Sequence, residues 1–519
     1  MQQDSIRVAL DWEVDHIDPP CSFGGWNTGR VVQQMFDSLV EDNLNSEIGA
    51  VTSLVPSLAV SHSVSPDGLR YTFRLREGVT FHDGATCDAD AVRMNIERMW
   101  DTSSPYFDER AFDYNRMAIE TLKSVQVSDA RTIELELTDP FPEFLRYATQ
   151  EDAPGAFVMV SPEYIHTDIG KRASAPGTGP YALEKRFKTP HGDGALLRRY
   201  RGYWGRPAAT EFIECTPIPS GENRSEALIR DSADIVYGPD PSSLDELSRR
   251  GFIVSERPIP YVWYIALNIN KAPLNDVRVR RALLHAIDRK SLSEELFGSA
   301  TAPMNGILPP ASPSYEPGFP DLYPFQPQRA RELLAAAGVN DGFTFTFSIA
   351  RAGSGQLNPV GIAERIRRDL ENVGIGVDLR INEDWVEYCE DWHQGMNSEI
   401  DASEMSWGMS CDVWVEQVLH SRNASPRGFN TGYYHNEQVD KMFNVARREL
   451  EPEKRAMLYQ TAHRLIMLDA PVIPLLTIRR GLVAHHPRVQ GLRFPAQNWH
   501  NLSDAWLDRS IGLNARSSS

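Results

Sequence analysis

The sequence has no long apolar run. A membrane-spanning helix needs about 18 consecutive apolar residues, and the longest apolar stretch, YVWYIALNI at residues 261–269, has the length of a strand. An export signal is also missing, because the chain passes from the polar start MQQD directly into the strand-like IRVAL. The residues leave two explanations open: a signal removed before Met1, or a cytosolic protein.

Cysteine is scarce and forms no metal-binding or redox pattern. No CxxC pair and no Cys/His cluster with zinc spacing occurs, so we expect no bound metal and no cofactor. Buried, unpaired thiols are the simplest expectation. One disulfide would be possible in an oxidising compartment. The odd number of cysteines leaves at least one thiol unless two chains are cross-linked. The five residues, whose pairing the sequence leaves open, are Cys21, Cys87, Cys215, Cys389 and Cys411.

The common enzyme motifs are also missing, and basic residues are fewer than acidic ones. No G-x-S-x-G, H-E-x-x-H or Walker motif is present, which favours a binding protein and leaves a hydrolase as the alternative of another class. Lys and Arg number 53 against 71 Asp and Glu, a net charge of −18. This charge excludes a general affinity for nucleic acid or anionic membranes.

The 519 residues are enough for two or three packed units. Alternating apolar and polar residues predict strands, and segments with helical spacing lie between them. Residues 329–337 and 362–373 each end at a glycine and precede a strand-like segment, which indicates β–α–β units and an α/β fold. The predicted strands are 6–10, 69–76, 131–138 and 343–350, and further helices are predicted over 89–100, with Asp88 as N-cap, and 277–287.

The pair His82–Asp83 invites a catalytic interpretation. Asp83 is followed by Gly84, however, and Asp-Gly is a strong turn dipeptide. No nucleophile completes a triad with the pair. We therefore predict a strand, a tight turn and a capped helix here.

The stretch YTFRLREGVTFHDGATCDADAV (71–92) resembles the signature of the family 5 extracellular solute-binding proteins, the peptide, nickel, oligosaccharide and opine carriers of bacterial ABC importers. Further segments resemble the family in its order along residues 6 to 510. These are GTGPYAL (177–183), NINKAPLNDVRVRRALLHAIDR (268–289), LENVGIGVDLRINEDW (370–385), YYHNEQVDKMF (433–443) and RLIMLDAPVIPLL (464–476).

The resemblance implies a two-lobed periplasmic binding protein of α/β fold, with a hinge between the lobes. The main part of lobe one would consist of residues 1–41, 174–261 and 485–519, and an extra subdomain of that lobe would consist of residues 42–173. Lobe two would consist of residues 262–484. It also implies a monomer, exported to the periplasm, that closes on a small ligand and delivers it to an ABC transporter permease. No nucleic acid partner is expected.

Peptide-binding members of the family carry a Trp-x-x-Asp segment whose aspartate meets the peptide's ammonium group. The matching segment here is SWGMSCDVW (406–414), which supplies Trp407, Gly408 and Met409 as candidate ligand-binding residues. Ser410 occupies the aspartate's position, and Asp412 lies two residues later. Residues 410 and 412 would share a face of an extended segment, so Asp412 is either the same group shifted or an outward residue.

Two glycine-rich loops and several aromatic residues complete the candidate site. The loop FGGWNTG precedes a helix, and the resemblance places it at the ligand, which selects Trp26, Asn27 and Thr28. Arg351 and Ser354 lie in the loop ARAGSGQ, and Trp385 and Tyr388 offer flat faces for stacking on sugar rings.

A buried ammonium group needs a carboxylate partner, and Ser410 does not provide one. The sequence therefore favours a glycoside, a sugar phosphate or an opine-like ligand. In lacking this anchor the chain also resembles the opine-phosphodiester (agrocinopine-like) branch of the family. An oligopeptide or dipeptide is the alternative.

Overall fold

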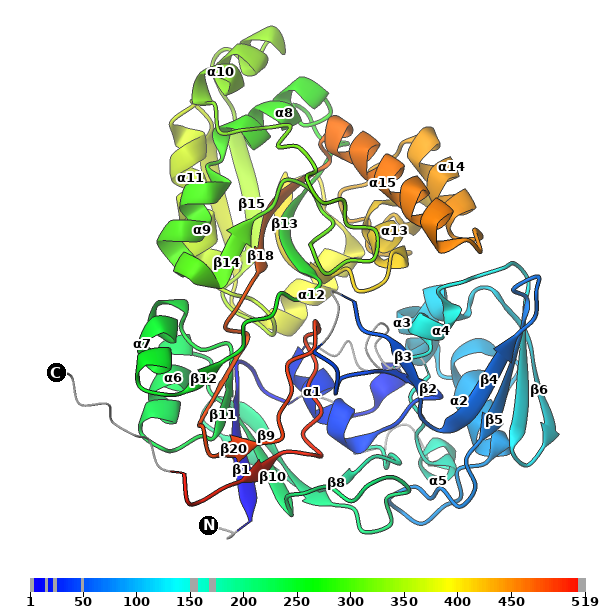
Figure 1. The fold of residues 1–519 in the computed structure, drawn as a ribbon. Coiled ribbons are helices and arrows are strands. Elements are labelled where there is room, and N and C mark those ends of the chain that lie inside the picture. Colours follow the sequence, from blue (N-terminus) through cyan, green and yellow to red (C-terminus); the bar gives the residue numbers. More distant parts are fainter. Residues whose placement is uncertain are drawn as a thin grey trace. The chain divides into compact units, whose positions relative to one another are not determined.

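A computed structural model describes residues 4–14, 17–21, 26–47, 51–149, 157–167 and 174–511 (Figure 1). The chain divides into two compact units: unit 1 is Met1–Arg257 with Gly481–Ser519, and unit 2 is Pro258–Arg480. The predicted division of the first lobe into a main part and an extra subdomain stays a prediction. None of the helices in the described residues is long and apolar enough to cross a membrane.

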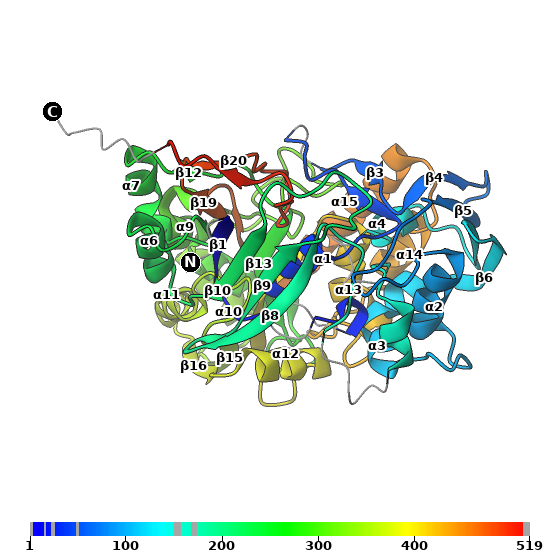
Figure 2. The same ribbon diagram turned by 90° about the horizontal axis from the view of Figure 1, so that it is seen from below.

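A seven-stranded mixed sheet forms the centre of unit 1, in the order β12-β19-β11-β1-β10-β9-β8. Strand β1 runs parallel to β10 and β11, and the other pairs are antiparallel. Figure 2 shows β1, β10, β9 and β8 side by side. The strands are β1 (Ser5–Leu10), β8 (Tyr181–Thr189), β9 (Gly192–Arg199), β10 (Phe212–Pro217), β11 (Ile235–Tyr237), β12 (Ile253–Val254) and β19 (Val483–His485).

Short helices follow three strands of this sheet, and a small two-stranded ribbon comes after its last strand. Helix α1 (Trp26–Met35) follows β1 along the chain, and α6 (Gly221–Ile229) and α7 (Leu244–Arg249) follow β10 and β11. Strands β20 (Val489–Gln490) and β21 (Trp506–Leu507) pair near the end of the chain. Single 3-10 turns are η1 (Pro19–Cys21) and η3 (Pro241–Ser243).

A second, four-stranded antiparallel sheet in unit 1 has the order β4-β5-β7-β6. Its alternation follows the sequence, since Tyr71, Phe73 and Leu75 of β5 are buried and the residues between them face outward. The elements of this part are β2 (Val40–Asp42), β3 (Leu54–Pro56), β4 (Ala59–Val64), β5 (Arg70–Leu75), α2 (Ala89–Trp100), α3 (Glu109–Ile119), β6 (Leu122–Asp129), β7 (Thr132–Leu137), α4 (Phe144–Tyr147) and α5 (Pro162–His166).

The structure assigns His82 a structural contact. Gly177 N–H donates to His82 Nδ1 (3.2 Å), so the proton is on Nε2, which lies 3.0 Å from the Gly179 carbonyl oxygen. Burial lowers the pKa of His82 to about 4, and the ring is therefore neutral. A side chain on Gly177 or Gly179 would overlap the backbone of Met35. The imidazole thus holds the 177–179 loop against the end of α1.

A buried ion pair network anchors α2. The Arg98 side chain is fully buried and donates to both carboxylate oxygens of Asp18, at 2.8 and 2.5 Å, and to Asp108 at 3.2 Å. Asp88 caps α2 as predicted, because its carboxylate accepts from Ala91 N–H.

Unit 2 contains a six-stranded mixed sheet in the order β14-β18-β13-β17-β15-β16. The predicted β–α–β pattern is present: β15 is parallel to β16 and β17, and α11 and α12 connect them. Gly338, at φ +81°, and Gly374, at φ +89°, follow α10 and α11, as the predicted helix ends require. The strands are β13 (Tyr261–Leu267), β14 (Thr301–Pro303), β15 (Thr344–Ala350), β16 (Gly376–Asn382), β17 (Ala402–Gly408) and β18 (Val472–Ile478).

Helices surround this sheet, and Figure 1 shows α8 to α11 gathered beside β15 and β14. They are α8 (Val277–Ala286), α9 (Arg289–Phe297), α10 (Pro327–Ala336), α11 (Pro359–Glu371), α12 (Trp385–Gln394), α13 (Val413–Leu419), α14 (Glu437–Ala446) and α15 (Pro452–Asp469), with 3-10 turns η4 (Gly298–Ala300) and η5 (Ser421–Asn423). All five cysteines are buried and none forms a disulfide, as the sequence predicts.

Candidate functional site

In unit 2 the predicted site residues follow the carboxyl ends of three parallel strands. Strand β15 ends at Ala350, β16 at Asn382 and β17 at Gly408. Carboxyl ends of neighbouring parallel strands lie at one edge of a sheet, where α/β proteins bind their ligands. This edge carries Arg351, Ser354, Trp385, Tyr388, Trp407, Gly408, Met409, Ser410 and Asp412.

Three segments at this edge are in direct contact. A side chain on Gly353 would overlap the Trp385 ring, so the loop after β15 lies against the start of α12. Ser406 Oγ donates to the Gly355 carbonyl oxygen (3.4 Å), which connects the same loop to the end of β17. Trp385 and Tyr388 stack with ring centroids 6.0 Å apart. The structure therefore brings most of the predicted residues of unit 2 together.

Arg351 is placed differently from its neighbours. Its side chain is 52% exposed and forms an ion pair with Glu383, with Arg351 Nη2 2.7 Å from Glu383 Oε1. Ser354, in the same loop, is buried. An anion would have to compete with Glu383 for the guanidinium group.

Trp407 is part of an aromatic cluster. Its ring lies 5.6 Å from Trp392, 5.9 Å from Trp414 and 5.1 Å from Phe429, measured between centroids. Its Nε1–H donates to the Trp414 carbonyl oxygen (3.2 Å). Packing and hydrogen bonding therefore fix the indole plane before any ligand arrives, and the remaining face of this half-buried ring is the part that a solute could contact.

Asp412 is buried, and Ser314 holds its carboxylate. The Ser314 backbone N–H donates to Oδ1 at 3.0 Å, and the Ser314 hydroxyl donates to Oδ2 at 2.7 Å. Of the two roles that the sequence leaves open for Asp412, this geometry favours an internal one. Ser410 and Met409 are also buried, and Gly408 contacts the Tyr261 ring.

Sequence reasoning missed Glu404, which lies in the middle of β17. Its side chain is buried, and burial raises the pKa of Glu404 to about 8, so it is mostly protonated at neutral pH. The Gln356 amide lies 3.2 and 3.3 Å from the two carboxyl oxygens. Rotating this amide lets Gln356 accept from the acid or donate to the carboxylate. The signal in the sequence was a charged residue inside an otherwise buried strand pattern, ASEM.

In unit 1 the predicted residues lie at the first turn of α1. Trp26, Asn27 and Thr28 are all buried, and the preceding residues 22–25 lie outside the described residues. Asn27 accepts from Arg30 at 2.9 Å. The Arg30 guanidinium group lies 5.4 Å from the centre of the Trp26 ring.

Arg30 was also missed, although it lies one helical turn after Trp26. It is 4% exposed, forms an ion pair with Asp11 (3.1 Å) and lies 4.0 Å above the Tyr237 ring. Asp11 and Tyr237 are at the carboxyl ends of the parallel strands β1 and β11. Arg30 Nη2 donates to Asn498 Oδ1 (3.1 Å), which adds the late segment 497–500 to this edge.

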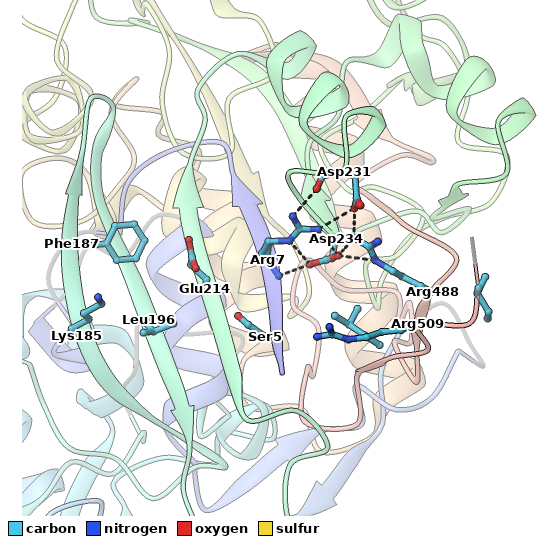
Figure 3. A pocket seen from close by; sticks show the side chains of 12 residues that line it. Ser5, Arg7, Lys185, Phe187, Leu196, Glu214, Asp231, Asp234, Arg488 and Arg509 are labelled. Atoms are coloured by element: carbon cyan, nitrogen blue, oxygen red, sulfur yellow. Dashed lines mark hydrogen bonds and ion pairs between the residues drawn. The ribbon is translucent and has the colours of Figure 1, made fainter. Parts of the chain in front are cut away.

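A hollow of about 880 Å³ is lined in part by strands β1, β8, β9 and β10 of the large sheet of unit 1 (Figure 3). One row of paired residues on neighbouring strands lines it: Arg7 on β1, Glu214 on β10, Leu196 on β9 and Lys185 on β8. Its other lining residues are Ser5, Phe187, Asp231, Asp234, Arg488, Leu507, Arg509 and Ile511.

Charged side chains of this hollow form ion pairs with one another. Asp234 is buried between Arg7 and Arg488, with 2.9 Å from Arg7 Nε to Oδ2 and 3.0 Å from Arg488 Nε to Oδ1 (Figure 3). Burial acts to raise the pKa of Asp234, but hydrogen bonds from Arg7 and Arg488 hold it below its usual value. We interpret this network as a clamp that fixes the last segment of the chain to β1.

Within the described residues, no three His, Cys, Asp or Glu side chains are grouped so that they could hold a metal ion.

The model of the family "Bacterial extracellular solute-binding proteins, family 5 Middle" matches residues 53–425. The chain belongs to this family. Its members are periplasmic solute-binding proteins of ABC importers and are not enzymes.

Relatives of this solute-binding protein agree with the assignment. The glutathione-binding protein GsiB of Salmonella typhi is 29% identical over 464 residues, 87% of this chain and 85% of the relative. DppA of Helicobacter pylori, in complex with the peptide STSA, has a TM-score of 0.84 at 24% identity, over 97% and 98% of the two chains. AgaA of A. tumefaciens R10, in complex with agropinic acid, has a TM-score of 0.82 at 20% identity, over 97% and 99%. The two-lobed α/β fold predicted from the sequence is confirmed.

Proposed function

We propose that this solute-binding protein captures a small, oxygen-rich solute, a glycoside, a sugar phosphate or an opine-like compound, and delivers it to an ABC transporter permease. The observation that carries the proposal is the state of Asp412. Its carboxylate accepts two hydrogen bonds from Ser314 inside unit 2, and Ser410 stands where peptide-binding members carry aspartate. A peptide's ammonium group would therefore lack its usual partner.

Desolvation disfavours an ammonium group at this site. An ammonium group buried without a carboxylate loses its hydration and gains no ion pair. A hydroxyl-rich solute needs only neutral donors and acceptors and flat apolar faces. Ser410 and the rings of Trp385 and Trp407 are groups of these kinds, at one edge of one sheet.

A peptide solute is the second candidate, and two observations favour it. The relative GsiB, named above, binds glutathione, an acidic tripeptide. Glu404 is a buried acid three residues before Trp407 on the same strand, without an ion pair to any described residue that would neutralise it. An ammonium group that reached Glu404 would lower its pKa below neutrality. The acid would then release close to one proton for each solute bound at pH 7.

A thermal-shift screen of the purified protein tests the proposal. The panel pairs sugar monophosphates, glycosides and opines with glutathione and dipeptides, because a solute that binds the native state alone raises the melting temperature. A shift confined to the first group supports the proposal, and a shift confined to peptides contradicts it.

Calorimetry in two buffers of different ionisation enthalpy then separates the mechanisms. A sugar phosphate or opine should bind with the same enthalpy in both buffers at pH 7. A peptide that uses Glu404 should show release of close to one proton, and Glu404→Gln should abolish this release. Glu383→Gln, at an exposed acid near the same edge, is the matched control.

A further inference from the structure

Unit 1 contains buried nitrogen atoms that have no hydrogen-bond partner in the described parts of the chain. Four of them belong to one cluster: Arg30 Nε, Asn498 Nδ2 and Trp499 Nε1, together with His500 Nδ1. The first three are obligate donors, since each carries hydrogen and no lone pair for bonding. Their residues are at most 9% exposed. Buried donors are almost always satisfied, so three from neighbouring residues call for an explanation.

The residues lie close together at the carboxyl edge of the large sheet. Arg30 Nη2 contacts Asn498 Oδ1, and Gly29 lies so close to the Trp499 ring that a Cβ would overlap it. The Gln34 amide donates to the His500 carbonyl oxygen (2.9 Å), which fixes the 498–500 segment to α1. This segment contributes adjacent side chains, and α1 contributes the guanidinium group.

The charge around this cluster is balanced. Arg30 pairs with Asp11, whose side chain is 12% exposed. Arg224 is buried beyond them, and its guanidinium group donates to the carbonyl oxygens of Ile218, Pro219 and Gly238. Asp240, which caps η3, also lies within electrostatic range of Arg224.

His500 adds no charge to this balance. Burial, with the nearby positive charge of Arg30, lowers the pKa of His500 to about 3. The cluster therefore contains two guanidinium groups and two carboxylates. The atoms of Arg30, Asn498 and Trp499 that lack a hydrogen-bond partner are all donors.

We infer that Arg30, Asn498 and Trp499 form a recognition site for a group of the solute that only accepts hydrogen bonds, a carboxylate or a phosphate. The inference rests on the proposed function and deepens it, because it names the chemical group that unit 1 would hold. Asn27, which accepts from Arg30, keeps the guanidinium group oriented. Arg30 pairs with Asp11 through Nη1 and with Asn498 through Nη2, so its Nε–H can bind a solute without a change in either contact.

Two nearly isosteric variants test the site. Trp499→Phe removes the indole N–H and keeps an aromatic ring, and Asn498→Asp keeps the acceptor that Arg30 uses while replacing the donor. The matched controls are Trp506→Phe, at a 45% exposed tryptophan, and Asn501→Asp, where the side-chain oxygen accepts from Ser503 N–H. The probes are inorganic phosphate, succinate, glucose 6-phosphate and glutathione, with glucose as the uncharged counterpart.

We expect each cluster variant to weaken binding of the anionic probes about tenfold or more, since hydrogen bonds to charged groups are the stronger ones. The controls should keep the wild-type Kd. In a ¹⁵N spectrum, the indole N–H resonance that disappears in Trp499→Phe should move when phosphate or succinate is added and stay in place with equal ionic strength of chloride.

Each other result overturns a distinct claim. An anionic probe that binds equally well to wild type, Trp499→Phe and Asn498→Asp means that ordered water fills the site, and the inference fails while the proposed function stands. Binding of peptides alone, without movement of the Trp499 resonance by anions, overturns both. Equal binding of glucose and glucose 6-phosphate overturns the anionic class and leaves the glycoside proposal in place.

Discussion

Replacing Glu404 by glutamine should change how the stability of the protein depends on pH. In the folded state burial raises the pKa of Glu404 from 4.5 to about 8. Between these values the folded state holds a proton that the unfolded state has lost. The stability of the wild type therefore falls as pH rises, by about 1.4 kcal/mol per pH unit from this residue alone. A glutamine amide has nearly the same shape, can still pair with Gln356 and does not titrate.

The magnitude follows from the width of the window. Over the two units from pH 5 to pH 7, the stability of Glu404→Gln relative to wild type should increase by about 3 kcal/mol. Differential scanning calorimetry at pH 5, 6 and 7 measures this as a widening difference in the melting temperature of the transition that the substitution affects. Separate transitions are followed because two units need not unfold together.

The matched control is Glu383→Gln, whose carboxylate is 68% exposed and pairs with Arg351. Its difference from wild type should stay nearly constant over this range. If the curves of Glu404→Gln and wild type run parallel from pH 5 to pH 7, Glu404 is already ionised in the folded protein. The reasoning from burial would then be refuted.

Three further predictions concern other parts of the chain. Arg98→Met should lower the free energy of unfolding by about 3–5 kcal/mol in urea titrations, because Asp18 and Asp108 would stay buried without their partner; an effect below 1 kcal/mol would contradict a buried pair. His82→Ala should cost about 2 kcal/mol in the same titration and leave solute Kd unchanged; weakened binding would refute its structural role. Ser410→Asp should weaken anionic solutes at least tenfold in calorimetry; unchanged affinity would remove Ser410 from the site.

The local features of the fold could be predicted because they depend on neighbours in sequence. The alternation in β1 and β15, the cap at Asp88 and the turn after His82 are all settled within a few residues. The resemblance to the family then supplied the two-lobed arrangement, which no local pattern contains.

The candidate site was predictable only in part, since its chemistry depends on partners far along the chain. Asp412 has two possible roles in the sequence, and the Ser314 contact that favours one of them lies 98 residues away. Arg30 meets Asn498 across 468 residues, and no periodicity reports that distance. Glu404 is visible as a charge in a buried strand, but its pKa depends on burial that only the packed sheet provides.

The place of β19 has a consequence for the order in which the protein can be assembled. This strand lies between β11 (235–237) and β12 (253–254) and pairs with both. These two strands can therefore form their hydrogen bonds to β19 only when residues 483–485 have been made. A ribosome that has made all of unit 2 has still not supplied the strand that completes unit 1. Until then β11 and β12 expose unpaired edges, which invite pairing with other chains. A chain truncated before Val483 should therefore aggregate even though it contains every strand of the sheet of unit 2.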